Sequence, residues 1–149
     1  KQAIGEIATR ASDQKGQFTA AQAARLGVDR VTLRRDTRNS VVRSIRHGVY
    51  IFKATPFSPD EELRTAWLSL DPSRTVAKRL QAPEQIVICT TSAGKQHGIG
   101  DFGTPQHEFY SANRKHTRAK DIRLRIRTLE KKTLKLAMGY HDHTNTHHL

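Results

Sequence analysis

Cysteine is almost absent from this chain of 149 residues, and long apolar runs are missing as well. The one cysteine, Cys89, excludes an internal disulfide, argues against a cysteine-based zinc site and fits a reducing cytoplasm best. The longest apolar run is residues 86–89, whereas a membrane-spanning helix needs about 18 residues. Charge is mixed into every turn of residues 1–12, so we expect no secretory signal there. The sequence therefore predicts a cytoplasmic protein with no membrane segment.

Acidic side chains are scarce too. Lysine and arginine number 26 against 14 aspartates and glutamates, which gives a formal net charge of +12. The excess is uneven, because residues 1–57 carry +7, residues 58–112 carry −2 and residues 113–149 carry +7. Blocks of one sign favour a polyanionic partner, most often nucleic acid. A merely solvated basic surface is the alternative.

Two helices are predicted near the N-terminus. The first spans residues 3–12, where apolar side chains recur at helical spacing. The second begins after Thr19, because Thr19 and Gln22 have the spacing of a capping box. Gly27 suits the left-handed residue that ends such a helix. The alanines at positions 20, 21, 23 and 24 are small enough to let another helix cross this one closely.

A third helix is predicted over residues 30–38, with Asp29 as its N-cap and Leu33 facing inward. Its outward residues are Arg30, Val31, Thr32, Arg34 and Arg35. A helix, a short turn and a basic helix form the helix-turn-helix arrangement, whose second helix enters the major groove of DNA.

A β-hairpin is predicted next. Residues 41–46 and 49–52 are strand-like, and His47 and Gly48 form the turn between them. A helix-turn-helix followed by a basic hairpin makes a winged helix-turn-helix. Arg43, Arg46 and His47 would lie on the wing.

The second half of the chain mixes helix and strand signals. A linker containing Pro56 leads to a helix that carries Leu63, Trp67 and Leu70, with Ser58 as its N-cap and Pro59 as its first residue. Further elements are predicted at residues 73–81 (helix), 86–90 (strand), 91–97 (helix), 108–110 (strand) and 121–128 (strand).

The fold class expected from these elements is α+β, an N-terminal winged helix-turn-helix followed by a small, incomplete α+β domain. We expect the first domain over residues 1–57 and the second over residues 58–135. Residues 136–149 form a His-rich tail that we expect to be disordered.

Three segments resemble the N-terminal winged helix of the AbiE-type antitoxins, the AbiEi family. They are FTAAQAARLGV at 18–28, LRR at 33–35 and RHGVY at 46–50. TSA at 91–93 followed by HGI at 97–99 is similar to the opening of that family's C-terminal domain. The resemblance covers roughly residues 4–127.

The chain also departs from the family pattern. Asp36 stands where an apolar residue is usual, Asn39 and Ser40 replace a glycine, and Lys95 and Gln96 interrupt an apolar helix. After Leu129 the rest of the family's C-terminal domain is absent, so the chain looks C-terminally truncated.

The resemblance implies an antitoxin of a type IV toxin–antitoxin operon. Such proteins repress their own promoter by binding double-stranded operator DNA, usually at an inverted repeat. Their C-terminal domain counters a nucleotidyltransferase-like toxin without a stable complex. Because the C-terminal domain looks incomplete, the residues support repression better than toxin neutralisation, and the oligomeric state is left open.

Seven residues are our candidates for DNA contact: Arg30, Thr32, Arg34 and Arg35 on the helix, and Arg43, Arg46 and His47 on the wing. Arginine pairs with guanine edges or phosphates, and wing residues more often touch phosphate or the minor groove. A possible second basic face consists of Arg123, Arg125 and Arg127 on one strand. The alternative for that face is an edge strand kept soluble by charge.

We predict no catalytic site, no built metal site and no cofactor. Ser92 and His97 have the types of a nucleophile and a base, but no acidic residue near them in sequence could orient the histidine, and a helix cap and a helix-end histidine explain them better. The four histidines of the tail lack the spacing of a folded metal site.

Two rival functions keep the same fold. A nuclease-like enzyme with a winged-helix targeting module would need clustered carboxylates, for which the candidates are Asp60, Glu61, Asp71 and Glu84. A winged helix that binds only protein predicts that the outward arginines are paired with carboxylates.

Overall fold

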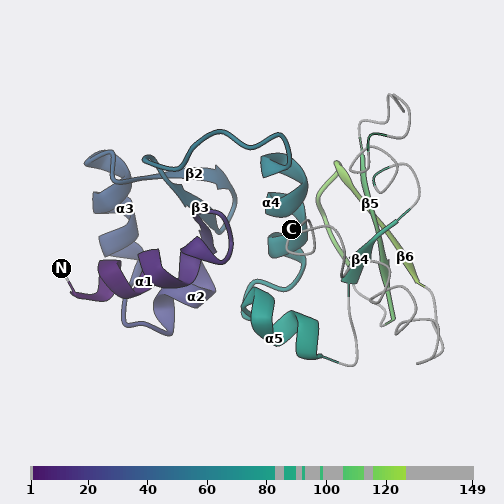
Figure 1. Ribbon diagram of the computed structural model, residues 1–149, viewed down its shortest axis with the longest axis horizontal. Helices are drawn as coiled ribbons and strands as arrows, with labels where there is room; N and C mark the ends of the chain where they lie inside the picture. Colours follow the sequence, from purple (N-terminus) through teal and green to yellow (C-terminus); the bar gives the residue numbers. More distant parts are fainter. Residues whose placement is uncertain are drawn as a thin grey trace. The chain divides into compact units, whose positions relative to one another are not determined.

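The computed structural model describes residues 2–82, 86–89, 92, 98, 106–112 and 116–126. The chain is mixed α+β and divides into two compact units, the first ending at Arg79 and the second beginning at Leu80. Each unit holds one small three-stranded sheet, ordered β1-β3-β2 in the first and β4-β5-β6 in the second (Figure 1).

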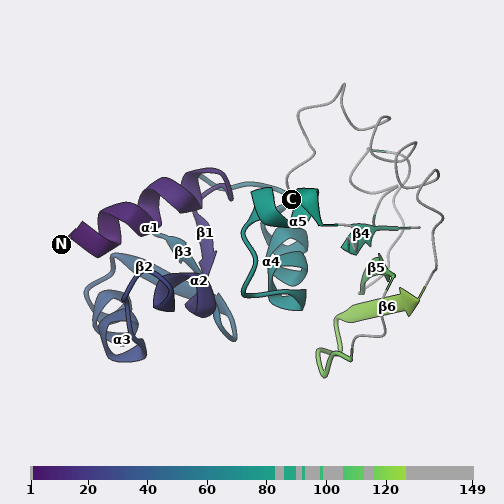
Figure 2. The ribbon, with the colours of Figure 1, turned by 90° about the horizontal axis from the view of Figure 1, so that it is seen from below.

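Eight of the described elements begin in the first unit, and the last of them, α5, ends two residues past Arg79. They are α1 (Gln2–Ser12), β1 (Gln17–Thr19), α2 (Ala20–Ala24), α3 (Arg30–Arg38), β2 (Val42–Arg46), β3 (Val49–Phe52), α4 (Glu61–Leu70) and α5 (Val76–Gln81). The three predicted helices before residue 40 and the hairpin after it are confirmed. The sheet lies between α3 on one side of this unit and α4 on the other (Figures 1 and 2).

Strand β1 was not predicted. It pairs antiparallel with β3, from Gln17 opposite Ile51 to Thr19 opposite Val49. Gly16 precedes it at φ +78°, a conformation that glycine adopts without strain. A strand of three residues gives too short an alternation to stand out in a sequence.

Helix α2 begins and ends as its residues predict. The Thr19 hydroxyl accepts the Gln22 N–H at 3.1 Å, and the Gln22 side chain accepts the Thr19 N–H at 3.1 Å, which completes the capping box. Gly27 has φ +78°, and its N–H donates to Ala24 while the Val28 N–H donates to Ala23. These two bonds form the glycine-ended motif that terminates a helix sharply.

The core of the first unit is small and continuous. It contains Ile7, Ala11, Phe18, Ala23, Val28, Leu33 and Val42. The Phe18 ring stacks on Tyr50 with centroids 5.7 Å apart, and lies 5.3 Å from the Phe52 ring. This cluster ties α1, the α2–α3 pair and the hairpin into one body.

Buried glutamines join this core to residues that come more than fifty positions later. The Gln14 and Gln22 side-chain amides bond to each other reciprocally at 2.9 and 3.0 Å. Gln22 also donates to the Arg74 carbonyl at 3.0 Å, and Gln14 accepts the Val76 N–H at 3.4 Å. Every polar atom buried here needs such a partner, so the pair fixes the segment before α5 onto the N-terminal helices.

Helix α4 begins later than expected. The prediction of Ser58 as N-cap and Pro59 as first residue is wrong, because residues 59 and 60 form a turn and α4 starts at Glu61, with Asp60 at the cap. Gln17 of β1 donates to the Glu61 carbonyl at 3.0 Å. The first compact unit therefore extends past residue 57, where the sequence suggested a boundary.

Arg79 closes the C-terminal end of α4. Its guanidinium donates to the Trp67 carbonyl at 2.6 Å, to the Leu68 carbonyl at 2.8 Å and to the Asp71 carbonyl. It also lies 4.3 Å from the centre of the Trp67 ring, which is buried. Burial lowers the pKa of Arg79 to about 10, so the group still carries its charge at neutral pH.

The second unit holds β4 (Ile86–Ile88), β5 (His107–Ser111) and β6 (Ile122–Ile126), close to the predicted strands. β4 pairs antiparallel with β5, and β5 pairs parallel with β6. Ile122 is buried while Arg123 and Arg125 are exposed, which confirms the predicted alternation of this strand. The expected helix over 91–97, except Ser92, and the tail over 136–149 lie outside the described residues.

Candidate nucleic-acid interface

Asp29 sets the start of α3 and hence the direction in which its side chains point. The Asp29 carboxylate accepts the Thr32 N–H at 2.8 Å, as a capping aspartate should. That hydrogen bond favours the ionised form and is the main reason why the pKa of Asp29 lies below its ordinary value. On the opposite side, Leu33 is buried in the core and anchors the helix.

The outward face of α3 is almost entirely cationic. Arg30, Arg34, Arg35 and Arg38 are all exposed, and so is Val31 at 69%. Thr32 is half-buried. We call the five exposed residues the α3 stripe. Arg38 was not among the predicted site residues, although it lies four positions after Arg34 on the same helical face.

Little negative charge balances the α3 stripe. Arg35 lies 3.8 Å from Asp36, its own neighbour, whose carboxylate is buried and has one oxygen without a hydrogen-bond partner. Within the described part of the chain, no ion pair involves Arg30 or Arg34. The arginines therefore present their charge to solvent.

The β2–β3 hairpin carries the other predicted contact residues. His47 is exposed in the turn, where Gly48 has φ +75°, and Arg46 is half-buried beside a bulge in the pairing of β2 with β3. Arg43 is different, because its guanidinium donates to the Glu61 carboxylate of α4 at 2.6 Å. Sequence reasoning missed this ion pair, since the two residues were placed in different predicted domains.

The predicted second basic face is partly neutralised. Arg123 and Arg125 lie 3.5 and 3.3 Å from the same carboxylate oxygen of Glu108. Glu108 is buried on β5, directly opposite Arg123 in the parallel pairing. Arg127 lies outside the described residues. The two arginines therefore share the negative charge of Glu108. We expect them to bind an anionic ligand more weakly than the α3 stripe does.

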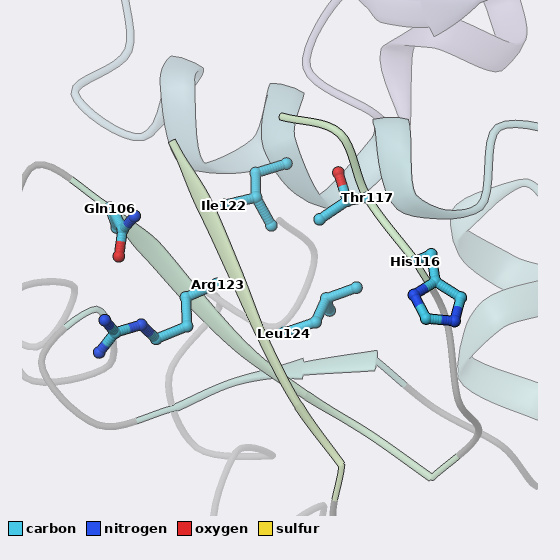
Figure 3. Close-up of a pocket in the computed structure, with 6 residues that line it drawn as sticks. All are labelled: Gln106, His116, Thr117, Ile122, Arg123 and Leu124. Atoms are coloured by element: carbon cyan, nitrogen blue, oxygen red, sulfur yellow. The ribbon is translucent and has the colours of Figure 1, made fainter. Parts of the chain in front are cut away.

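A hollow of about 320 Å³ opens beside β6. It is lined by Gln106, His116, Thr117, Ile122, Arg123 and Leu124. Figure 3 shows Arg123 and Leu124 extending to opposite sides of the strand. Apart from Ile122 and the half-buried Leu124, the residues that line the hollow are polar. It therefore resembles a solvent-exposed surface depression more than an apolar ligand pocket.

Three of the residues considered for chemistry, Ser92, Glu61 and Asp71, are engaged in structural bonds. The Ser92 hydroxyl is buried and accepts the Glu108 N–H at 2.8 Å, and His97 lies outside the described residues. Asp71 lies 3.5 Å from Arg74, Glu61 is paired with Arg43, and Glu84 also lies outside the described part. Among the described residues, no three histidine, cysteine or carboxylate side chains gather as a metal site would require.

None of the helices described is both long enough and apolar enough to cross a membrane.

Comparison with known families gives one match that includes the α3 region. Residues 6–53 match the family model of the transcriptional regulators described as AbiEi antitoxins. Residues 6–53 are therefore similar to the corresponding segment of the AbiEi antitoxins. The AbiEi match runs from α1 to just past β3, so it includes the whole α3 stripe and the hairpin, and it covers less than half of the chain. No curated protein matches the chain.

Proposed function

We propose that the chain is a transcriptional repressor that binds operator DNA through a winged helix-turn-helix, with α3 in the major groove. The observation that carries the proposal is the α3 stripe, in which Arg30 and Arg34 are exposed and unpaired among the described residues. The match of residues 6–53 to a family of transcriptional regulators supports it.

The α2–α3 pair has the construction that a recognition helix needs. Alanines on α2 allow close approach of the two helices, and the motif ending at Gly27 makes the turn short. Leu33 and Val28 hold the inner side, so the opposite side of α3 is free to enter a groove about 12 Å wide.

The hairpin would serve as the wing. Arg46 and His47 lie at its turn, where contact with phosphate or the minor groove is the usual role of such residues. Arg43 keeps about half of its side chain exposed, at 47%, while Glu61 neutralises its charge. We therefore assign Arg43 a smaller share of binding than the α3 arginines.

The antitoxin role rests on the family match and on the second unit. We propose that a nucleotidyltransferase-like toxin is countered functionally, through residues after the first unit, and that the operator is an inverted repeat in the chain's own promoter. Arg123 and Arg125 would form a second contact with an anionic partner in this unit. We assign no enzymatic activity, since Glu61 and Asp71 are held in ion pairs.

Binding to promoter duplexes tests the proposal. Replacing Arg34 and Arg35 with alanine should weaken binding at least tenfold at moderate salt, because each arginine can supply a phosphate or guanine contact. Arg10→Ala is the matched control, since Arg10 is also exposed but lies on α1, outside the α3 stripe. Fluorescence anisotropy measures both. Equal losses of affinity in the double variant and the control would reject α3 as the recognition helix.

A nuclease would show itself in the same reaction mixtures. Incubation of the duplex with the chain and Mg²⁺ should leave the DNA intact, and metal-dependent cleavage that survives repurification would favour the enzymatic alternative.

A further inference from the structure

Val31 is the one apolar member of the α3 stripe and is 69% exposed. At about 100° per residue, the five stripe residues fill an arc of about 140°. Val31 falls between Arg34 and Arg35 within this arc, and it lies in the first turn of α3. The N-terminal residues of a recognition helix are the ones that reach base edges.

A valine side chain at such a place has a restricted set of partners. It carries no donor or acceptor, so a base edge that offers only polar atoms would lose its water without gaining a hydrogen bond. The one apolar feature in the major groove is the 5-methyl group of thymine. A β-branched residue in a helix is also nearly fixed in one rotamer, so its two methyl groups have a defined position.

We propose that Val31 is a specificity-determining residue that contacts a thymine methyl group in the operator. This inference rests on the proposed function, because it requires α3 to lie in the major groove. The residues of the α3 stripe would then have two roles. The arginines would supply affinity through guanine or phosphate contacts, and Val31 would select thymine at one position.

Replacing thymine with deoxyuridine tests the assignment, because it removes the methyl group alone. Duplexes bound by the full chain are first selected from a random library, and each thymine is then replaced in turn. The wild-type chain should bind about fourfold more weakly when one particular thymine is replaced, the change expected for one apolar carbon. Val31→Ala should bind the thymine duplex correspondingly less well and should be insensitive to the replacement at that position.

Val41→Ala is the matched control, since Val41 is another exposed valine, at 39%, outside α3. It should retain the wild-type response to deoxyuridine. If Val31→Ala keeps the same penalty as the wild type, or if no replaced thymine weakens wild-type binding, the assignment of Val31 is wrong while DNA binding stands. If selection yields no bound duplex at all, the proposed function itself fails.

Discussion

At the scale of single residues, Asp29 has the clearest physical role. Its carboxylate caps α3 and fixes where the helix begins, while burial of Leu33 leaves the opposite side outward. The capping hydrogen bond lowers its pKa, so the folded state holds the ionised form more strongly than the unfolded state does. The cap therefore fixes the start of the helix that carries the α3 stripe.

The Asp29 cap makes stability depend on acidity. A carboxylate with a lowered folded-state pKa stabilises the fold fully above its unfolded pKa, about 3.9, and the stabilisation is lost as pH falls through the lower folded value. Asp29→Asn keeps a capping side chain without the charge. The melting temperature of the wild type, measured by circular dichroism, should exceed that of Asp29→Asn at neutral pH, and the gap should begin to narrow as the pH falls below about 4. A gap that does not change with pH would contradict this.

At the scale of elements, α4 restrains the hairpin. Glu61 in the first turn of α4 binds Arg43 of β2 at 2.6 Å, and Gln17 of β1 donates to the Glu61 carbonyl. The ion pair removes one positive charge from the surface that would face DNA. The hairpin and α4 are therefore linked electrostatically as well as by packing.

Releasing Arg43 should strengthen DNA binding. In Glu61→Gln the carboxylate charge is gone while the backbone carbonyl that binds Gln17 remains. We expect affinity to rise about two- to threefold at low salt and the gain to vanish at high salt, because screening weakens a single exposed charge. Anisotropy titrations at two salt concentrations measure this. Weaker binding by Glu61→Gln in a correctly folded protein would show that the pair supports the wing instead.

Elements whose signals are local were predictable. The bounds of α3 follow from Asp29 and from helical periodicity, and the hairpin follows from the turn at His47 and Gly48. Three features that the sequence concealed depend on partners brought together by folding. The Gln14–Gln22 pair, the Arg43–Glu61 pair and strand β1 each need a neighbour that only the folded chain supplies.

At the scale of the whole molecule, the division of the chain is set by buried polar contacts. Thr19 donates to the Pro72 carbonyl and Gln22 donates to the Arg74 carbonyl, so residues beyond the expected boundary at 57 complete the N-terminal core. Without these partners, the Thr19 hydroxyl and one Gln22 amide hydrogen would lose their acceptors, and a buried donor left unpaired costs about 1–3 kcal/mol.

Truncation distinguishes the two boundaries. A fragment of residues 1–79 should unfold cooperatively in urea, whereas a fragment of residues 1–57 should be markedly less stable, because Gln17, Thr19 and Gln22 would be deprived of their partners. Tryptophan fluorescence cannot compare the two fragments, since Trp67 is absent from the shorter one, so circular dichroism is the measurement. Equal free energies of unfolding for the two fragments would instead support a domain boundary at residue 57.

The salt dependence of DNA binding tests the central claim most directly. If the arginines of the α3 stripe bind phosphates or bases, the logarithm of affinity should fall steeply with the logarithm of salt concentration for the wild type. The slope for the Arg34→Ala, Arg35→Ala double variant should be shallower by about 0.9 for each phosphate that its side chains no longer neutralise. A double variant with both the slope and the affinity of the wild type would show that these side chains do not contact DNA, and would contradict the account.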